Sequence, residues 1–334
     1  MKLRKTFSLA LVLSASFLLN PALQAAEPVE NYPSKPVQFI VPYSPGGPLD
    51  AAARLLSDKV QDTDFGQRIF VDNKAGAGGN IGIDTMIRSG KDGYTIAMGA
   101  VATMAINPWL YSKIPFDASK DIAPVLLVSN VPNVLVLNKE FADENNINDL
   151  PALFAYMKAN PGKLNYASGG NGSAGHLAGE LLKNKLVISM VHVPYQGANP
   201  AKLSLLANET QLMFDNLASA QTLIESGKVK ALAVTTAKRS KFLPDVSTLQ
   251  EAGVDDFDIG TWFGIVAPAG TPEPIITKLN AVYAQAMKDP KVQEQLRAMG
   301  SDLEPGSAQD FADFAKKEYD KYKEIVELSN ARID

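Results

Sequence analysis

Short runs of β-branched and aromatic residues alternate with longer segments in which apolar residues recur at helical spacing. In the first part of the chain, strand-like runs at 37–43, 68–72 and 95–98 enclose helical segments at 49–60 and 80–88. A strand, an amphipathic helix and a further strand in succession are typical of parallel βαβ units. The pattern therefore predicts an α/β fold with parallel strands.

The same alternation resumes in the middle of the chain. Strands are expected at 134–137, 164–167, 191–194, 211–214 and 231–235, and helices around Ala152, Leu177, Leu203 and Leu223. A chain of 334 residues is longer than one hydrophobic core normally serves. The second set of elements therefore predicts a second sheet and a second lobe.

Residues 122–138 form a double apolar run interrupted by Pro132, which we interpret as one strand leaving the first lobe and another entering the second. A third apolar strand at 262–267 leads into helices at 273–287, 291–299 and 308–328, which are expected to return to the first lobe. Two crossings make a hinge, the usual device for closing around a small ligand. The expected lobes are 26–128 with 260–334, and 129–259.

The N-terminus has the layout of a secretory signal. Lys2, Arg4 and Lys5 precede an apolar run at 7–19, and small residues follow, so cleavage is expected near Ala25. The alternative is a membrane anchor, but a spanning helix needs roughly 20 apolar residues. The sequence therefore predicts an exported protein of the periplasm, with residues 1–25 removed.

Charge and residue usage exclude several partners and chemistries. The sequence has 32 basic and 36 acidic residues, and loss of the three basic residues of the signal moves the net charge from −4 to about −7. Nucleic acid and anionic membrane surfaces are therefore not expected partners. The chain has no cysteine and only two histidines, His176 and His192, so neither a metal site nor a cofactor is expected.

Two glycine-rich loops, at 42–50 and 75–82, each join an expected strand to an expected helix. Such a junction presents unpaired main-chain N–H groups and the positive end of the helix dipole, so it can bind a carboxylate without Arg or Lys. The alternative is that each loop is only a tight turn. The second loop lacks the last glycine of the dinucleotide fingerprint, which disfavours a nicotinamide enzyme.

Polar residues also follow the expected strands of the second lobe. Ser173 either caps the helix that carries His176 or contacts a ligand, and Ser168 and Asn171 could serve either purpose. Asp215 could accept a hydrogen bond from a ligand hydroxyl or amine, or cap the next helix. Because no GxSxG elbow surrounds Ser173, a hydrolase that uses Ser173 and His176 is disfavoured.

Segments 42–50, 75–82, 107–111, 193–201 and 262–272 occur in the same order in one family, and the chain resembles the Bug proteins. These are the TctC-like periplasmic binding components of tripartite tricarboxylate transporters. The resemblance covers essentially the whole mature chain. It implies the two-lobed periplasmic binding protein (Venus flytrap) fold and a small mono-, di- or tricarboxylate ligand, which could be aromatic.

The resemblance also implies which residues bind the ligand. In the family, the first-lobe loops hold one carboxylate, partly through water, and second-lobe segments hold the other end. The residues of this sequence taken as ligand contacts are Tyr43, Ser44, Gly46, Gly47, Asp50, Gly78, Gly79, Asn80, Ile81, Thr103, Ser168, Asn171, Ser173, Tyr195 and Asp215. The segment 100–103, Ala-Val-Ala-Thr, and Trp109 are less polar than is usual in relatives, which favours a less polar ligand.

Three functions remain open at this stage. The leading one is a monomeric receptor that captures a small organic carboxylate and delivers it to membrane permease subunits, with no catalysis. The second is a sensor subunit whose liganded form contacts a histidine kinase of a two-component system. The third, less favoured, is a periplasmic hydrolase or lyase.

Overall fold

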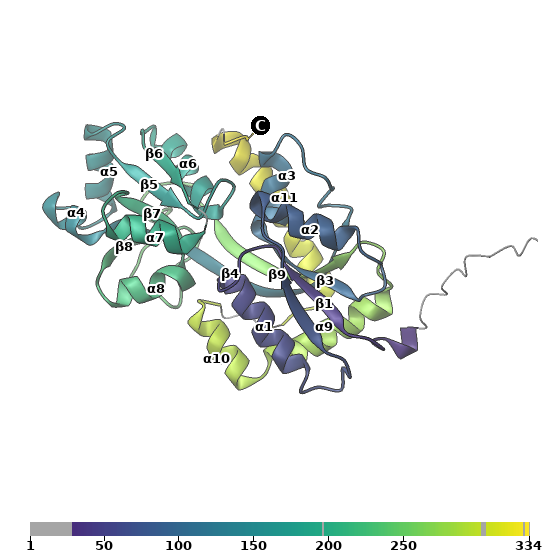
Figure 1. The fold of residues 1–334 in the computed structure, drawn as a ribbon. Coiled ribbons are helices and arrows are strands. Elements are labelled where there is room, and N and C mark those ends of the chain that lie inside the picture. Colours follow the sequence, from purple (N-terminus) through teal and green to yellow (C-terminus); the bar gives the residue numbers. More distant parts are fainter. Residues whose placement is uncertain (1–28, 196, 302–304, 330, 334) are drawn as a thin grey trace, which may run out of the picture.

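The computed structural model describes residues 29–195, 197–301, 305–329 and 331–333. The expected signal segment, 1–25, lies outside the described residues. Figure 1 shows two α/β lobes, with the middle of the described chain forming one and the described parts on either side of it forming the other. The expected α/β class is therefore confirmed, and strands and helices lie within a few residues of the expected positions.

The first lobe is built on a sheet with helices on both sides (Figure 1). Its elements are β1 (Val37–Val41), α1 (Pro48–Val60), β2 (Ile69–Asn73), α2 (Asn80–Ile87), β3 (Thr95–Ala100), β9 (Gly260–Pro268), α9 (Glu273–Met287) and α10 (Pro290–Ala298). Strand β1 lies between β2 and β3 and is parallel to both, as the βαβ pattern predicts. Strand β9 pairs with β3 in the antiparallel direction.

The second lobe repeats this arrangement. Its elements are α4 (Lys139–Glu144), α5 (Leu150–Ala159), β5 (Asn165–Ser168), α6 (Ala174–Leu186), β6 (Val191–Pro194), α7 (Ala198–Leu206), β7 (Leu212–Asn216), α8 (Leu217–Glu225) and β8 (Val229–Val234). Strand β5 is parallel to β6 and to β7. The carboxyl ends of these strands lead into α6, α7 and α8, so the loops at that edge come together.

One strand, β4 (Ile122–Asn138), belongs to both sheets. Its first part pairs with β9 as far as Pro132, and its second part pairs with β7 and β8 from residues 133 and 134 onward. The expectation of two separate strands is wrong, because Pro132 does not break the strand. It lies at the last pair of the β9 ladder, opposite Gly260, and the end of a ladder tolerates a residue without an N–H group.

The C-terminal helix α11 (Ala308–Ser329) contacts both lobes. It packs on β4 and on the irregular helix η3 (Ala102–Ile106) of the first lobe, and also on α6 of the second. Glu318 accepts a hydrogen bond from the indole of Trp262 on β9 at 2.9 Å. The helix returns to the first lobe as expected, and it also packs on the second.

The buried side chains form three clusters. One joins the first sheet to α1, α9 and α10, and another lies under α7 and α8. The third runs from Ile83 and Leu110 in the first lobe, through Phe311 of α11, to Tyr166 and Leu177 in the second. None of the helices in the described ranges combines the length and apolar character that crossing a bilayer requires.

Candidate ligand-binding site

The first glycine loop ends at Gly47, the N-cap of α1, and Pro48 occupies the first helical turn, as expected. No side chain caps this helix. The loop is held by Asp50, which is buried and whose carboxylate accepts hydrogen bonds from Gly46 N–H at 2.9 Å, from Arg54 Nε at 3.1 Å and from Asn73 Nδ2 at 2.9 Å. Asp50 was predicted as a ligand contact, and here its two oxygens brace the loop.

Burial alone would raise the pKa of Asp50, but hydrogen bonds from Arg54, Gly46 and Asn73 outweigh it and hold the pKa below its usual value. The carboxylate is therefore ionised at neutral pH. Ser44 and Gly46 are exposed, and Gly46 adopts φ +85°, a conformation that glycine reaches without strain. The loop is thus held in place by Asp50, while its main chain at Ser44 and Gly46 stays accessible to solvent.

The second glycine loop lies against the first. A side-chain carbon at Gly82 would be 2.7 Å from Cα of Pro42, and one at Gly79 would be 3.0 Å from the hydroxyl of Tyr43 and 2.7 Å from Cγ2 of Thr103. Gly79 is the N-cap of α2, with φ +96°, and no side chain caps this helix either. The start of α2 therefore contacts the first glycine loop at Pro42 and Tyr43, and Tyr43 and Thr103 both approach Gly79.

Sequence reasoning did not single out Asn107, at the start of α3 (Asn107–Leu110), as a ligand contact. Its Nδ2 donates to Asn80 Oδ1 at 2.7 Å and to the carbonyl of Gly78 at 3.2 Å, so it ties the second loop to α3. Its Oδ1 is buried and has no hydrogen-bond partner within the described part of the chain. The only signal in the sequence was its place in the family segment 107–111.

Other predicted first-lobe residues have distinct surroundings. Thr103 is fully buried, and its hydroxyl is hydrogen-bonded to the main chain of Ala100, so its methyl group faces Gly79. Ile81 is 51% exposed and covers Gly76. Trp109 donates from its indole to the carbonyl of Tyr319 on α11, which ties α3 to the C-terminal helix.

The second-lobe turn between β5 and α6 is held by its own side chains. The hydroxyl of Ser173 accepts from His176 N–H at 3.2 Å and caps α6, as one of the two interpretations expected. A hydroxyl that accepts in this way keeps its own proton for a second bond. Ser168 is buried and hydrogen-bonded to Gly170 and to His192, whereas Asn171 is exposed.

Ser173 and His176 are not arranged as a nucleophile and base. The ring of His176 accepts from Gly172 N–H through Nδ1 at 3.2 Å, and the bond to Ser173 comes from the main chain of His176. A general base needs its ring nitrogen on the nucleophile. Within the described ranges, no group of three or more acidic or histidine side chains could hold a metal ion.

Tyr195 and Asp215 complete the second-lobe set. The hydroxyl of Tyr195 donates to Ser204 on α7 at 2.6 Å, and its main-chain N–H pairs with Ser168. Asn216, not Asp215, caps α8. Asp215 is 4% exposed, and its Oδ1 accepts from Asn216 N–H at 2.8 Å, while Oδ2 has no hydrogen-bond partner of normal geometry among the described residues.

Burial raises the pKa of Asp215 to about 6, although the Ser219 hydroxyl, the charge of Lys202 and the Asn216 N–H act in the opposite direction. A buried carboxylate oxygen without a partner is costly and usually has a functional reason. Asp215 therefore differs from Asp50, whose oxygens are all satisfied.

The two lobes meet at the turn that contains Gly172. A side-chain carbon at Gly172 would lie 2.6 Å from Leu110 and 3.2 Å from Asn107 Oδ1. The structure therefore brings the first-lobe loops, Asn107 and the second-lobe turn into one neighbourhood. Asp215 is on β7, whose residue Phe214 lies beside the first turn of α6 at Gly175.

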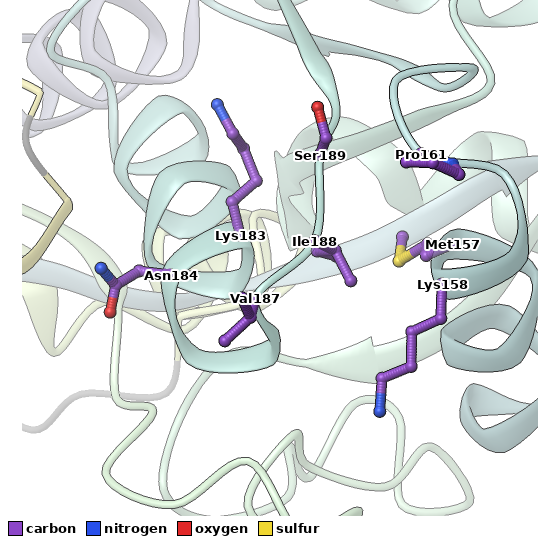
Figure 2. Close-up of a pocket in the computed structure, with 8 residues that line it drawn as sticks. All are labelled: Met157, Lys158, Pro161, Lys183, Asn184, Val187, Ile188 and Ser189. Atoms are coloured by element: carbon purple, nitrogen blue, oxygen red, sulfur yellow. The ribbon is translucent and has the colours of Figure 1, made fainter.

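A surface depression of about 560 Å³ lies elsewhere on the second lobe (Figure 2). It is lined by Met157, Lys158, Pro161, Lys183, Asn184, Val187, Ile188 and Ser189, at the C-terminal ends of α5 and α6. None of the predicted ligand contacts lines it. Because it lies at the opposite end of α6 from Ser173, it is a separate feature of the surface.

The sequence is similar to those of known proteins over most of its length. Residues 52–331 match the family described as Tripartite tricarboxylate transporter family receptor. Protein BugT of Bordetella pertussis is 33% identical over 95% of this chain and 96% of its own length.

Two solved structures from Rhodopseudomonas palustris are similar over most of the chain. Rpa4515 with adipate has a TM-score of 0.82 and 32% identity, over 90% of this chain and 98% of the other. MatC with bound malate has a TM-score of 0.80 and 32% identity, over 88% of this chain and all of the other (100%).

Proposed function

This chain belongs to the tripartite tricarboxylate transporter receptor (TctC) family, and we propose that its solute is a short dicarboxylate of the size of malate or adipate. The family consists of solute-binding receptors with the two-lobed periplasmic binding protein fold. The observation that carries the proposal is the pair of helix N-termini, at Gly47 and Gly79, that no side chain caps and whose loops contact each other. In the second lobe Ser173 caps α6 and Asn216 caps α8, whereas α7, which follows Gly197, also begins without a side-chain cap.

One carboxylate of the solute would be held by main-chain N–H groups at the starts of α1 and α2. A helix start offers N–H groups without intrahelical partners and about half a positive charge, which together stabilise an anion. At α2 the N–H groups of Gly79 and Asn80 already donate to Gly76 and Ala77, so the other N–H groups of this loop would bind the carboxylate. Tyr43 and Asn80 flank this position. Because Thr103 turns its methyl group toward it, recognition there depends on the main chain and on these two side chains.

The second-lobe residues would hold the other end of the solute. The Ser173 hydroxyl can donate to a carboxylate oxygen while it caps α6. The unpaired Oδ2 of Asp215 can accept from a hydroxyl group, an amine or a protonated carboxyl group of the solute. A hydroxy acid such as malate offers both kinds of group, whereas adipate lacks the hydroxyl.

Delivery to membrane permease subunits and export with cleavage near Ala25 belong to the same proposal. A two-lobed receptor that closes on its solute presents a different surface when it is loaded, which a permease can distinguish. No step of this cycle requires a cofactor or a chemical change in the solute.

A thermal-shift screen of mono-, di- and tricarboxylates, with malate and adipate included, tests the proposal. An acid present at 100 times its dissociation constant should stabilise the protein by about 2.7 kcal/mol. We expect stabilisation by at least one dicarboxylate, and mass spectrometry should recover that acid unchanged. The proposal fails if no acid stabilises the protein, or if the acid is converted.

Replacement of Ser173 separates its two roles. Glycine at an N-cap costs only a few tenths of a kcal/mol, whereas alanine costs about 1 kcal/mol. We therefore expect Ser173→Gly to keep the melting temperature of the wild type but to bind the acid more weakly. Ser173→Ala should have both a lower melting temperature and a lower affinity for the acid. Unchanged affinity in Ser173→Gly would limit Ser173 to helix capping.

A further inference from the structure

The two histidines of this chain are stacked on each other. The rings of His176 and His192 lie 4.2 Å apart at an angle of 15°, although one is on α6 and the other on β6. Tyr166 of β5 extends the stack, with its ring 4.8 Å from that of His192. A side-chain carbon at Gly179 would lie 2.2 Å from the Tyr166 ring, so only glycine at this position leaves room for the three stacked rings.

Each histidine bonds to the turn between Ser168 and Ser173. Nδ1 of His176 accepts from Gly172 N–H at 3.2 Å, and Nε2 of His192 lies 2.7 Å from the Ser168 hydroxyl. Ser168 in turn accepts from Gly170 N–H at 3.2 Å. The stack therefore holds the turn near both of its ends.

This turn is poorly defined by its own sequence. Gly170 and Gly172 have φ of +128° and +77°, and glycines give a loop many alternative conformations. The same turn leads to the Ser173 cap and places Gly172 against Asn107 and Leu110 of the first lobe. Its shape consequently sets both the position of Ser173 and the fit between the lobes.

We infer that His176 and His192 are positioning residues, whose neutral ring nitrogens, through their hydrogen bonds to Gly172 and Ser168, fix the turn from Ser168 to Ser173 in the shape that receives the solute. The inference rests on the proposed function, because the turn is taken to contact a carboxylate. It goes further in assigning a task to two side chains that do not themselves touch the solute.

The neutral state follows from the hydrogen bonds and the surroundings. A ring protonated on both nitrogens cannot accept from Gly172, so the bond at His176 requires an unprotonated Nδ1. Burial lowers the pKa of both rings, that of His192 to about 3, and the charge of Lys183 lowers both further. His176 also lowers the pKa of His192, and only Glu180 acts in the other direction, on His176.

Amide substitutions test the inference, because asparagine places its polar atoms near Nδ1 and glutamine near Nε2. In the matched pair of variants, His176→Asn and His192→Gln, the hydrogen bonds to the turn should be kept. In the exchanged pair of variants, His176→Gln and His192→Asn, they should be lost. Titration calorimetry with malate and adipate should give wild-type affinity within about twofold for the first pair. The exchanged pair should lose affinity about tenfold, the value of one good hydrogen bond.

Hydrogen exchange of the solute-free protein gives a second readout. Amides at 169–173 should exchange about tenfold faster in the exchanged pair than in the matched pair, since one hydrogen bond per ring is lost. Ring nitrogen spectra of the wild type should show His192 neutral at pH 6 and Nδ1 of His176 unprotonated at neutral pH. If the two histidines only stabilised the fold, all four variants would have a changed melting temperature, and the matched and exchanged pairs would not differ in acid affinity or in amide exchange.

The possible outcomes separate this inference from the proposed function. If the wild type binds acids and the exchanged pair matches it in affinity and in exchange, the inference is wrong and the proposed function stands. Titration of either ring near pH 6.5 in the wild type would also overturn the inference. If the wild type binds no acid, the proposed function fails, and the exchange rates alone decide whether the rings fix the turn.

Discussion

Two buried aspartates show how surroundings assign different tasks to the same side chain. Asp50 receives hydrogen bonds from Gly46, Arg54 and Asn73, and its pKa lies below the usual value. Asp215 keeps one oxygen without a partner of normal geometry among the described residues, and burial raises its pKa to about 6. The first stabilises a loop, and the second has an acceptor available for a solute.

Asp215→Asn tests this distinction through the pH dependence of stability. Because the folded-state pKa of Asp215, about 6, exceeds its unfolded value of 3.8, ionisation above pH 6 opposes folding. The substitution should raise the free energy of unfolding of the solute-free protein at pH 7.5, by up to about 3 kcal/mol. The gain should disappear as the pH falls toward 4.

Urea denaturation at a series of pH values measures this gain. Asp50→Asn is the control, since its ionised form stabilises the fold: this variant should be less stable than the wild type at pH 7.5, with the deficit shrinking at low pH. A destabilised Asp215→Asn variant at pH 7.5 would mean that the carboxylate has a partner in the folded protein.

At the scale of elements, sequence periodicity located most strands and helices but not their partners. The two glycine loops were recognised because they follow strands and precede helices, and the structure places both at helix N-termini. Asn107 was missed as a contact because its role depends on Gly78 and Asn80, which are far from it in sequence. The pairing of His176 with His192 was missed for the same reason.

Gly47 and Gly79 look equivalent in the sequence, but the structure separates them. Gly47 has φ −84°, and an added side-chain carbon would meet nothing closer than 3.9 Å, whereas Gly79 has φ +96° and would clash with Thr103 at 2.7 Å. Gly79→Ala should therefore destabilise the solute-free protein by about 1–3 kcal/mol. Gly47→Leu should leave its melting temperature nearly unchanged.

Binding should nevertheless be lost in Gly47→Leu, because the leucine side chain occupies space beside the N–H groups of α1. Thermal denaturation with and without malate or adipate measures both effects. A Gly47→Leu protein that is still stabilised by the acid would place the carboxylate elsewhere.

At the scale of the whole molecule, the resemblance noted in the sequence is confirmed, and the chain has the two-lobed fold that it implied. The continuity between lobes could not be anticipated. Pro132 suggested a break in β4, and nothing in the amphipathic pattern of α11 showed that its apolar face contacts both lobes. Both features depend on tertiary packing, which local propensity does not encode.

Phe311→Ala tests how strongly α11 unites the molecule. Phe311 is 1% exposed and packs edge-on against Trp262 at 6.0 Å. Loss of a buried phenyl ring typically costs 3–5 kcal/mol, roughly the stability change expected here. Because one buried cluster runs through both lobes, indole fluorescence and far-UV circular dichroism should still report a single coincident transition. Two separated transitions would show that the lobes unfold independently.

The central claim is that main-chain N–H groups at the starts of α1 and α2 hold a carboxylate of the solute. A crystal structure of the protein with the acid that stabilises it most tests this claim directly. The account predicts one carboxylate within hydrogen-bond distance of N–H groups in both glycine loops, with the rest of the acid reaching toward Ser173 and Asp215. An acid bound elsewhere, with both helix ends facing solvent, would contradict it.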